Sequence, residues 1–514
     1  ALSEAMRIAA DGSLSTPTAG TSNVRFGVNA GNSIASGGNF NTVVGDEAGT
    51  AITTGDQNTF VGFRAGDVTT TSSNNTGMGN NALGGNVLGS YNVAIGKDSL
   101  EEMNPATATD TYNTAVGAAA GQKVTTGVQN TLMGGIAGDA LTDADFNVAV
   151  GYSALSSDTL GSRSTAIGQE ALAAQNFTTA TDSYNTAVGF VAGAAVTTGI
   201  QNTLIGGRAG DSLTTGSYNV AVGFEALSTE DAHGNNVAIG NRALKTLNAG
   251  ATGLNIAVGD DAGTAMTTGV QNTLVGGQAG DALTDADFNI AIGTDALGSD
   301  TLGSRSIAIG RRALYTQNFT TATDSYNVAV GFEAGHNLTT GTSNTLIGGL
   351  AGDALTTGAA NVALGTSALG ADTLGQHNVA IGYQALDAQN FTTATNAYNV
   401  AVGSAAGGAV TTGVRNTLIG GLAGDSLTDG DDNIALGYNA LSTEDTGSKS
   451  IAIGFEALKT QNNAASNYNV AIGHAAGTAV TTGVQNTLIG GLAGDALTVG
   501  SDNVLLGINA GGGG

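Results

Sequence analysis

One eight-residue pattern recurs 28 times along this chain. Each copy starts with Asn, passes through a β-forming residue, a small or apolar residue and a branched apolar residue to Gly, and ends three residues later at Ala. Successive glycines are 17 residues apart after a first step of 18, and every fourth step is lengthened to 21 or 19. A fixed period of this kind indicates a solenoid of stacked coils rather than a set of globular domains.

The copy that begins at Asn147 illustrates one coil, which we call a rung. Residues 148–150 alternate β-branched and small side chains, which predicts a short strand, and Gly151 ends it where the chain must turn. We expect a second short strand carrying the recurrent Ala, here Ala154, and then a variable polar loop. The predicted fold class is an all-β parallel β-solenoid of about 28 rungs of 17–21 residues.

Both faces of the predicted strand lack charge. Its first and third residues lie on one face, and the Asn and the central residue lie on the other. In all 28 copies the five residues from Asn to Gly contain one charged side chain, Arg25 in the first copy. One face packs inside the rung, so the other is expected to meet another chain, and three-fold symmetry suits a fibre with an axial core. We predict a parallel homotrimer and expect Ala221→Glu with Ala238→Glu to abolish assembly.

Two columns of the pattern predict scaffold rather than a binding site. Asn is replaced by Ser in three of the 28 copies, at Ser164, Ser306 and Ser450. Stacked side-chain amides can hydrogen-bond from rung to rung, so the Asn column predicts a structural ladder. The Ala column has one exception, Ser99, and predicts a tight interior.

A second period groups the rungs in fours, in units of 72 or 70 residues. In one rung of each unit the centre of the strand is bulky (Phe60, Leu132, Leu204, Leu274, Leu346, Leu418, Leu488), whereas it is mostly Ala elsewhere. Another rung carries a longer loop, and the string QNFTTAT recurs at Gln175, Gln317 and Gln389. Such identity indicates duplication, which changes the length of a fibre without new chemistry.

Composition excludes several classes of function. The formal charge of −26 with 15 Lys plus Arg excludes a nucleic-acid groove and an anionic membrane surface as partners. The chain has no Cys, and no apolar run is long enough to insert into a membrane as a helix. The repeat predicts one fibre domain over residues 23–511, preceded by a lead-in over 1–22 and followed by a glycine exit segment over 512–514.

The strings Ser306–Gly310 (SIAIG) and Asn236–Gly240 (NVAIG) resemble the NSVAIG motif of the heads of YadA-like trimeric adhesins. The resemblance covers residues 23–511 and implies a left-handed parallel β-roll in which three chains pack through their inner strands. These rungs are longer than the family's usual coil, Ala replaces its common Ser after the turn, and no coiled-coil stalk or membrane anchor follows.

The opening string from Met6 to Leu14 resembles the lead-in of many bacteriophage tail-fibre proteins, which carry similar repeats. This second resemblance implies a structural tail-fibre shaft in a virion that presents a receptor-binding tip. The alternative is a trimeric adhesin on a bacterial surface. In either case the expected partners are two further copies of the chain and a host glycan or protein receptor, contacted through the tip or the loops.

Residues that could bind a metal or act as acids and bases are scattered along the sequence. The four histidines, His233, His336, His377 and His474, have no ligand spacing and are interpreted as surface residues. The adjacent acids Glu230–Asp231 and Asp260–Asp261 are interpreted as hydrated loop carboxylates.

The aspartate-rich segments 139–145 and 281–287 lack the spacing of known calcium loops. We therefore predict no catalytic, cofactor-binding or metal-binding residue, no cofactor, and no enzymatic activity.

Recognition, if this chain carries it, is predicted at the C-terminal end beyond Gly507, where residues 511–514 are all Gly and indicate an exit to a tip or an assembly domain. Loop residues Phe177, Phe319 and Phe391 are the alternative site. Aromatic residues recur directly before the strand Asn and are interpreted as packing residues: Tyr112, Phe146, Tyr184, Tyr218, Tyr326, Tyr398 and Tyr468.

Overall fold

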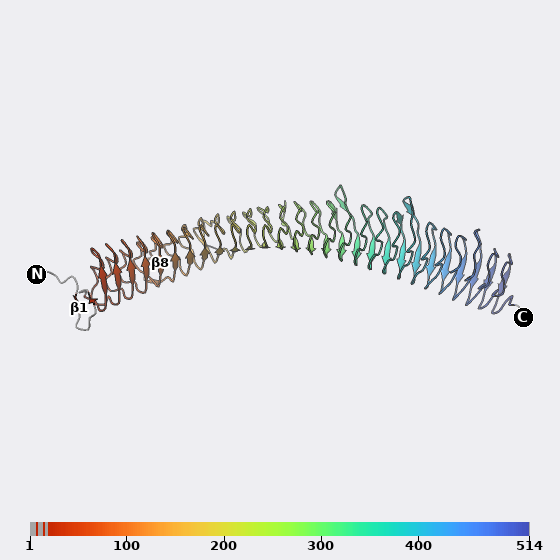
Figure 1. Cartoon of the computed structure of the whole chain (residues 1–514), viewed down its shortest axis with the longest axis horizontal. Coiled ribbons are helices and arrows are strands. Elements are labelled where there is room, and N and C mark those ends of the chain that lie inside the picture. Colours follow the sequence, from red (N-terminus) through yellow and green to blue (C-terminus); the bar gives the residue numbers. More distant parts are fainter. Residues whose placement is uncertain (1–6, 9–13, 16–18, 513–514) are drawn as a thin grey trace. The chain divides into compact units, whose positions relative to one another are not determined.

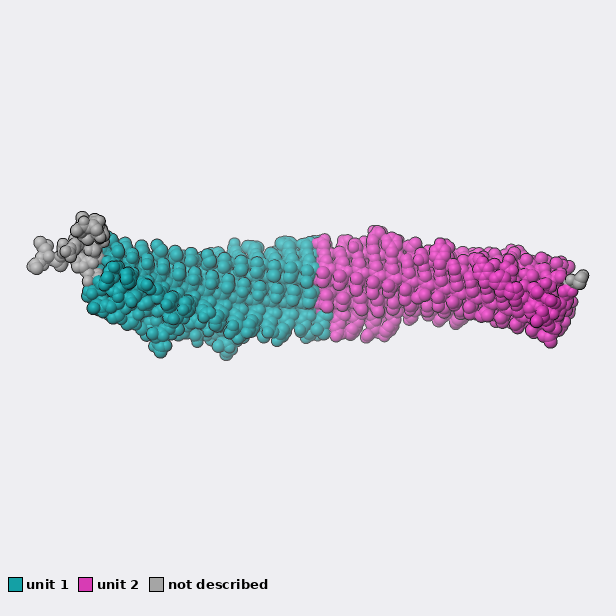
Figure 2. Space-filling model, turned by 90° about the horizontal axis from the view of Figure 1, so that it is seen from below, with its two compact units in different colours: residues 1–254 teal, residues 255–514 magenta. Residues whose placement is uncertain are grey.

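The computed structural model describes residues 7–8, 14–15 and 19–512 (Figure 1). These residues form short strands joined by turns, and no helix occurs among them. They divide into two compact units, Ala1–Leu254 and Asn255–Gly514, which are coloured separately in Figure 2. Each unit is a parallel β-solenoid, which confirms the predicted class and the rung count of about 28.

Unit 1 contains one three-residue strand per rung. The strands are β3 (Val24–Phe26), β4 (Thr42–Val44), β5 (Thr59–Val61), β6 (Thr76–Met78), β8 (Val93–Ile95), β10 (Thr114–Val116), β11 (Thr131–Met133), β12 (Val148–Val150), β14 (Thr165–Ile167), β16 (Thr186–Val188), β17 (Thr203–Ile205), β18 (Val220–Val222) and β19 (Val237–Ile239). Neighbours pair in parallel with equivalent residues side by side, as in Ala149↔Ala166.

Unit 2 repeats the same construction. Its rung strands are β20 (Ile256–Val258), β21 (Thr273–Val275), β22 (Ile290–Ile292), β24 (Ile307–Ile309), β26 (Val328–Val330), β27 (Thr345–Ile347), β28 (Val362–Leu364), β30 (Val379–Ile381), β32 (Val400–Val402), β33 (Thr417–Ile419), β34 (Ile434–Leu436), β35 (Ile451–Ile453), β36 (Val470–Ile472), β37 (Thr487–Ile489) and β38 (Val504–Leu506). Figure 1 shows the strands of each unit stacked side by side.

The predicted lead-in falls largely outside the described residues. Its described part holds β1 (Arg7–Ile8) and β2 (Leu14–Ser15), which pair antiparallel. Most of the string from Met6 to Leu14 lies outside the described residues, as do the last two residues of the predicted exit segment 512–514. The domain boundaries at 22 and 511 stay predictions.

The strand glycine of each rung has no substitute. Gly151 has φ of 137°, and a Cβ built on it would lie 2.4 Å from the carbonyl oxygen of Gly168 in the next rung. The predicted second strand is wrong as a regular element, because Ser153 and Leu155 have φ of 55° and 54°, which breaks the extended backbone. Their N–H groups nevertheless donate to neighbouring rungs, Ser153 to the oxygen of Gly135 and Leu155 to that of Ala171.

The rung interior is lined by the Asn and the central residue of each strand. Asn147 and Ala149 are fully buried, whereas Val148 and Val150 remain partly exposed. The same division places Ala221 of β18 inside the rung, so Ala221→Glu would act on the interior and not, as expected, on a face between chains. A carboxylate at this position would lie inside the rung and would oppose folding itself.

The predicted asparagine ladder is confirmed. The Oδ1 of Asn41 accepts the backbone N–H of Asn58 at 3.0 Å and the Nδ2 of Asn58 at 3.1 Å. The same Nδ2 also donates to the carbonyl oxygen of Ser72. Each buried amide is therefore satisfied by the neighbouring rung and by its own loop.

Part of each four-rung repeat fills its interior with hydrocarbon. The bulky residue Leu132 of β11 packs over Gly121 and Gly138, where a Cβ would lie 2.6 and 2.8 Å from its methyl groups. Seven residues after the strand glycine, Val124 and Leu141 complete this apolar half and are fully buried. The glycines thus provide the space that the larger side chain occupies.

In four of the repeats, two other rungs place a polar pair at the same depth: Asp158 with Gln175, Asp300 with Gln317, Asp372 with Gln389, and Glu444 with Gln461. Asp158 is fully buried, and its carboxylate accepts the Nε2 of Gln175 at 2.6 Å and the backbone N–H groups of Gly161 and Phe177. Burial raises the pKa of Asp158 above its ordinary value, although these donors oppose the rise. Gln175 also donates to Ser164 at 2.8 Å, so this Ser replaces Asn where it receives a side-chain amide.

The longer rungs carry lateral loops. Three loops that share the string QNFTTAT start at Gln175, Gln317 and Gln389, and each adds a two-residue parallel pair beside the ladder. These pairs, with one more in unit 1, are β7 (Gly89–Ser90) with β9 (Thr109–Asp110), β13 (Gly161–Ser162) with β15 (Thr181–Asp182), β23 (Gly303–Ser304) with β25 (Thr323–Asp324), and β29 (Gly375–Gln376) with β31 (Thr395–Asn396).

Candidate interaction surface

The outward strand residues form a continuous apolar strip in each unit, which we call the outer strand face. It consists of the first and third residues of every rung strand, for example Val220 and Val222 of β18. These positions are Val, Ile, Thr, Leu, Met or Phe in all described rungs, and none is charged. Equivalent β-branched residues of successive rungs stand side by side on this face. Their side chains are partly exposed to solvent.

Two rows of exposed residues flank this face. The leading row contains the residue before each strand Asn, and its exposed aromatics are Phe40, Tyr91, Tyr112, Phe146, Tyr184, Tyr218, Phe288, Tyr326, Tyr398 and Tyr468. The trailing row contains the residue after each strand glycine, and its exposed aromatics are Phe63, Tyr152, Phe190, Phe224, Phe332, Tyr383, Tyr438 and Phe455.

The leading row was interpreted as packing residues, and in the single chain its aromatic side chains are only partly covered. Tyr184 is 51 % exposed and Tyr326 is 57 % exposed. The cause is local, because the leading residue adopts a left-handed backbone, with φ of 50° at Tyr184, and this conformation turns the side chain away from the interior. Conversely, the loop residues Phe177, Phe319 and Phe391 are each 5 % exposed, so they anchor their loops by packing inward.

Stacking holds the rows together. The guanidinium of Arg163 lies 4.7 Å from the ring centre of Phe146 and 5.8 Å from that of Tyr184. In the trailing row, the rings of Tyr438, Phe455 and His474 stack at 5.8 and 5.2 Å. Rigid rings of this kind can join an interface at little cost in side-chain entropy.

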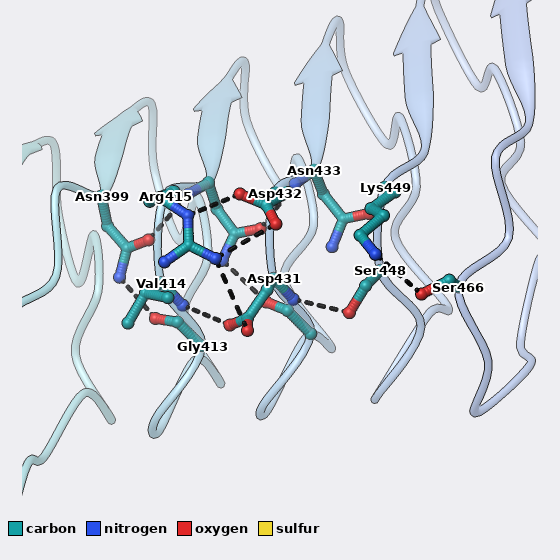
Figure 3. A network of polar contacts seen from close by, with 12 residues as sticks. Asn399, Gly413, Val414, Arg415, Asp431, Asp432, Asn433, Ser448, Lys449 and Ser466 are labelled. Atoms are coloured by element: carbon teal, nitrogen blue, oxygen red, sulfur yellow. Dashed lines mark hydrogen bonds and ion pairs between the residues drawn. The ribbon is translucent and has the colours of Figure 1, made fainter.

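In one stretch of the leading row, opposite charges pair between adjacent rungs. Arg415 donates from Nε to Oδ1 of Asp432 at 2.6 Å and from Nη2 to Oδ2 at 3.1 Å (Figure 3). Beside them, the Oδ1 of Asp431 accepts the backbone N–H of Val414, and the backbone N–H of Asp431 donates to Ser448. Arg415 holds the pKa of Asp432 below its ordinary value.

The aspartate-rich segments do not converge on a cation site. In the first segment, Asp145 accepts the N–H of Val128 at 2.7 Å and Asp143 accepts the hydroxyl of Thr126 at 2.5 Å. In the second, Asp287 accepts the N–H of Val270 at 2.8 Å. These carboxylates join neighbouring rungs through hydrogen bonds, in place of the serine hydroxyls used elsewhere.

The structure brings together residues that the sequence analysis kept apart. Glu230 was expected to be hydrated, but it is fully buried, and its carboxylate contacts His233 at 3.1 Å. With the exposed Asp231, these residues form a group of Glu, Asp and His whose ligand atoms lie within 4.8 Å of one another. The signal was present in the sequence as a His three residues after a Glu that occupies an interior position.

One surface hollow of about 300 Å³ lies beside rungs β5 to β8. Its walls include Arg64, Asp67, Asn81, Glu101 and Glu102. At Gly84 and Gly85 only the backbone lines it. Arg64 pairs with Asp67 at 3.0 Å, and Glu101 accepts the Nε2 of Gln122 at 2.7 Å. Two of the three carboxylates are thus engaged by partners.

No known protein family, curated protein or solved structure matches this chain. The described residues also include no helix that is long and apolar enough to cross a membrane.

Proposed function

We propose that this chain is a structural fibre protein that assembles as a parallel homotrimer through the outer strand face. The uncharged outer strand face carries the proposal, because soluble monomers rarely leave long apolar strips in water. Three copies arranged about a common axis would cover the face of each copy equally and would place the aromatic rows at the subunit boundaries. Native mass measurement tests this directly, and a monomer at micromolar concentration would contradict it.

The fibre proposed is the shaft of a bacteriophage tail fibre, located in the virion. The support is the resemblance of the opening string and of the repeats to those of phage fibres. The alternative is a trimeric adhesin on a bacterial cell surface, which the recurrence of the QNFTTAT string in three lateral loops favours because repeated epitopes bind with avidity. Antibody labelling of virions and of producing cells separates the two.

Receptor recognition is proposed at the tip of the fibre, with the lateral loops as the second candidate site. The loop surface is threonine-rich, since Phe177 is buried while Thr178 and Thr179 are exposed. Replacing these threonines and their equivalents at residues 320–321 and 392–393 by Ala leaves the anchoring Phe in place. Attachment to host cells should persist in this variant if the tip binds, and its loss would move recognition to the loops.

The role proposed is non-enzymatic and needs no cofactor. A polysaccharide-cleaving fibre would need two carboxylates placed across a sugar-sized groove. Glu101 and Glu102 line the surface hollow, so they are the carboxylates at which to test such an activity. Incubation with capsular and lipopolysaccharide glycans should leave their chain length unchanged, and shortened products that disappear in Glu101→Gln with Glu102→Gln would overturn the proposal.

A further inference from the structure

One interior acid or amide recurs in each four-rung repeat, seven residues after a strand glycine. The series is Asn86, Asp158, Glu230, Asp300, Asp372 and Glu444, all fully buried. In four members the carboxylate accepts the Nε2 of a glutamine in the next rung, at 2.6 Å for Asp158, Asp300 and Asp372 and at 2.9 Å for Glu444. A glycine follows three residues after each of these four, and a Cβ there would lie close to the carboxylate.

The Glu230 repeat departs from this arrangement at two positions. Leu247 stands where the sister repeats have the glutamine, and it is fully buried, so the amide donor is lost. His233 stands where they have the glycine, and its Nδ1 lies 3.1 Å from Oε1 of Glu230. The remaining donors to this carboxylate are the backbone N–H groups of His233 and Ala249.

A second carboxylate completes the group. Asp231 is exposed, and one of its oxygens lies within 4.8 Å of the ligand atoms of Glu230 and His233. The sister sequence Glu444–Asp445 has the same two acids, but Gly447 follows, and Gln461 and Asn467 donate to Glu444 at 2.9 and 3.0 Å. The imidazole thus appears in the repeat in which the buried carboxylate has lost its amide donors.

We propose that Glu230, Asp231 and His233 bind a divalent transition-metal ion of the zinc type. One imidazole nitrogen and two carboxylate oxygens form a donor set that Zn²⁺ accepts, with water in the open position. Two ligands on one tetrahedral zinc are about 3.3 Å apart when each bond is about 2.0–2.1 Å. The 3.1 Å between Oε1 of Glu230 and Nδ1 of His233 already matches this spacing.

Binding then requires two small changes. The exposed Asp231 side chain rotates inward, since its oxygen is the ligand atom that is free to move. His233 then binds the ion through Nδ1 as the tautomer that carries its ring proton on Nε2. In the sister repeats, a glutamine of the next rung donates a hydrogen bond to the buried carboxylate. At Glu230 the metal ion would take the place of this donor.

Competition of the full-length assembled protein with a chromophoric chelator for Zn²⁺ tests the proposal. We expect one tightly bound ion per chain, a loss of at least tenfold in affinity for Asp231→Asn, and a loss of at least a hundredfold for His233→Ala. Asp445→Asn, in the sister repeat, and His377→Ala, at an exposed histidine, should bind as the parent does.

Cobalt provides a second readout. Co²⁺ in the same site should give the visible absorption of a four-coordinate ion, and this band should vanish in His233→Ala. If His233→Ala folds poorly, Asp231→Asn remains informative because its side chain is exposed. Parent protein that binds no more Zn²⁺ than His233→Ala, or an unchanged affinity in Asp231→Asn, would overturn the proposal and leave His233 as a hydrogen-bonding substitute for the missing glutamine.

Discussion

Ala221 and Val222 are consecutive residues of β18, yet Ala221 is fully buried inside its rung while Val222 is partly exposed on the outer strand face. Neither face of the strand carries charge, so charge does not distinguish inside from outside. Size does, because the narrow interior admits Ala in most rungs and one Leu in four, whereas the outer strand face takes the β-branched residues. The two faces are therefore expected to respond differently to the same substitution.

Ala221→Glu should have the largest effect. The carboxylate would be buried without a partner between Ala238 and Leu204 of the adjacent strands, and the cost of several kcal/mol should prevent folding of the surrounding rungs. Circular dichroism and limited proteolysis of the variant check this. Parent-like melting of Ala221→Glu would show that the interior and the outer strand face have been assigned the wrong way round.

Val220→Glu with Val222→Glu should leave the strand content unchanged and abolish assembly. The new carboxylates point outward, so a single chain tolerates them, whereas three copies facing one axis would bury and repel them. Native mass measurement and circular dichroism together separate these outcomes. Thr215→Glu, which adds the same charge on an exposed loop, serves as the control.

Leu418→Ala should destabilise the fold by about 2–5 kcal/mol, the cost of a cavity at a fully buried leucine. Leu418 fills the space over Gly407 and Gly424, so neighbouring side chains cannot close the gap. Leu422→Ala, at a partly exposed turn position, should cost much less. Equal losses in denaturant titrations would contradict the packing described for the apolar half of each repeat.

Gln389→Leu should cost about 1–3 kcal/mol, because it removes the 2.6 Å hydrogen bond to the buried carboxylate of Asp372. The first repeat has Asn86 and Met103 at these two positions. The double variant Asp372→Asn with Gln389→Met should therefore recover most of the loss. A double variant less stable than Gln389→Leu would contradict the view that the polar half tolerates either pair.

The smallest expected effect is the change of folding stability with pH. Burial raises the pKa of Asp158 and Asp372, so the folded state binds these protons more tightly than the unfolded state. Stability should therefore rise as the pH falls from neutral through these raised values, and it should decline again as the pH rises. Melting temperatures at pH 7.5 and pH 5 measure this slope. Asp158→Asn with Asp372→Asn should flatten it.

Much of the fold could be predicted from the sequence because its signals are local and repeated 28 times. The rung period, the strand, the glycine and the Asn ladder follow from spacing and side-chain chemistry. The second strand was wrong because left-handed backbone at residues such as Leu155 leaves no mark in hydrophobic patterning. The face assignment failed because neither face carries charge and side-chain size separates the central residue from its two neighbours.

The sequence predicted an uncharged strand face, but it did not predict the direction of the aromatic side chains beside that face. Absence of charge indicated a covered face, but the direction of the leading aromatics depends on the φ of residues such as Tyr184. The replacement of Asn by Ser at Ser164 is visible in the sequence, but the hydrogen bond from Gln175 that accounts for it is visible only in the structure. Residues 17 or more positions apart meet in the interior, so pairs such as Glu230 with Ala249 required the three-dimensional structure.

The asparagine ladder has a consequence for how the molecule forms. The ladder Oδ1 accepts from the following rung, as Asn41 does from Asn58 and Asn92 does from Asn113, so a finished rung presents the acceptor that the next 17 to 21 residues need. Nearly all pairing is therefore with the segment just completed, and the loop closed at each step stays short however long the chain becomes. Folding can advance one rung at a time in the order of synthesis, with each rung acting as the template for its successor.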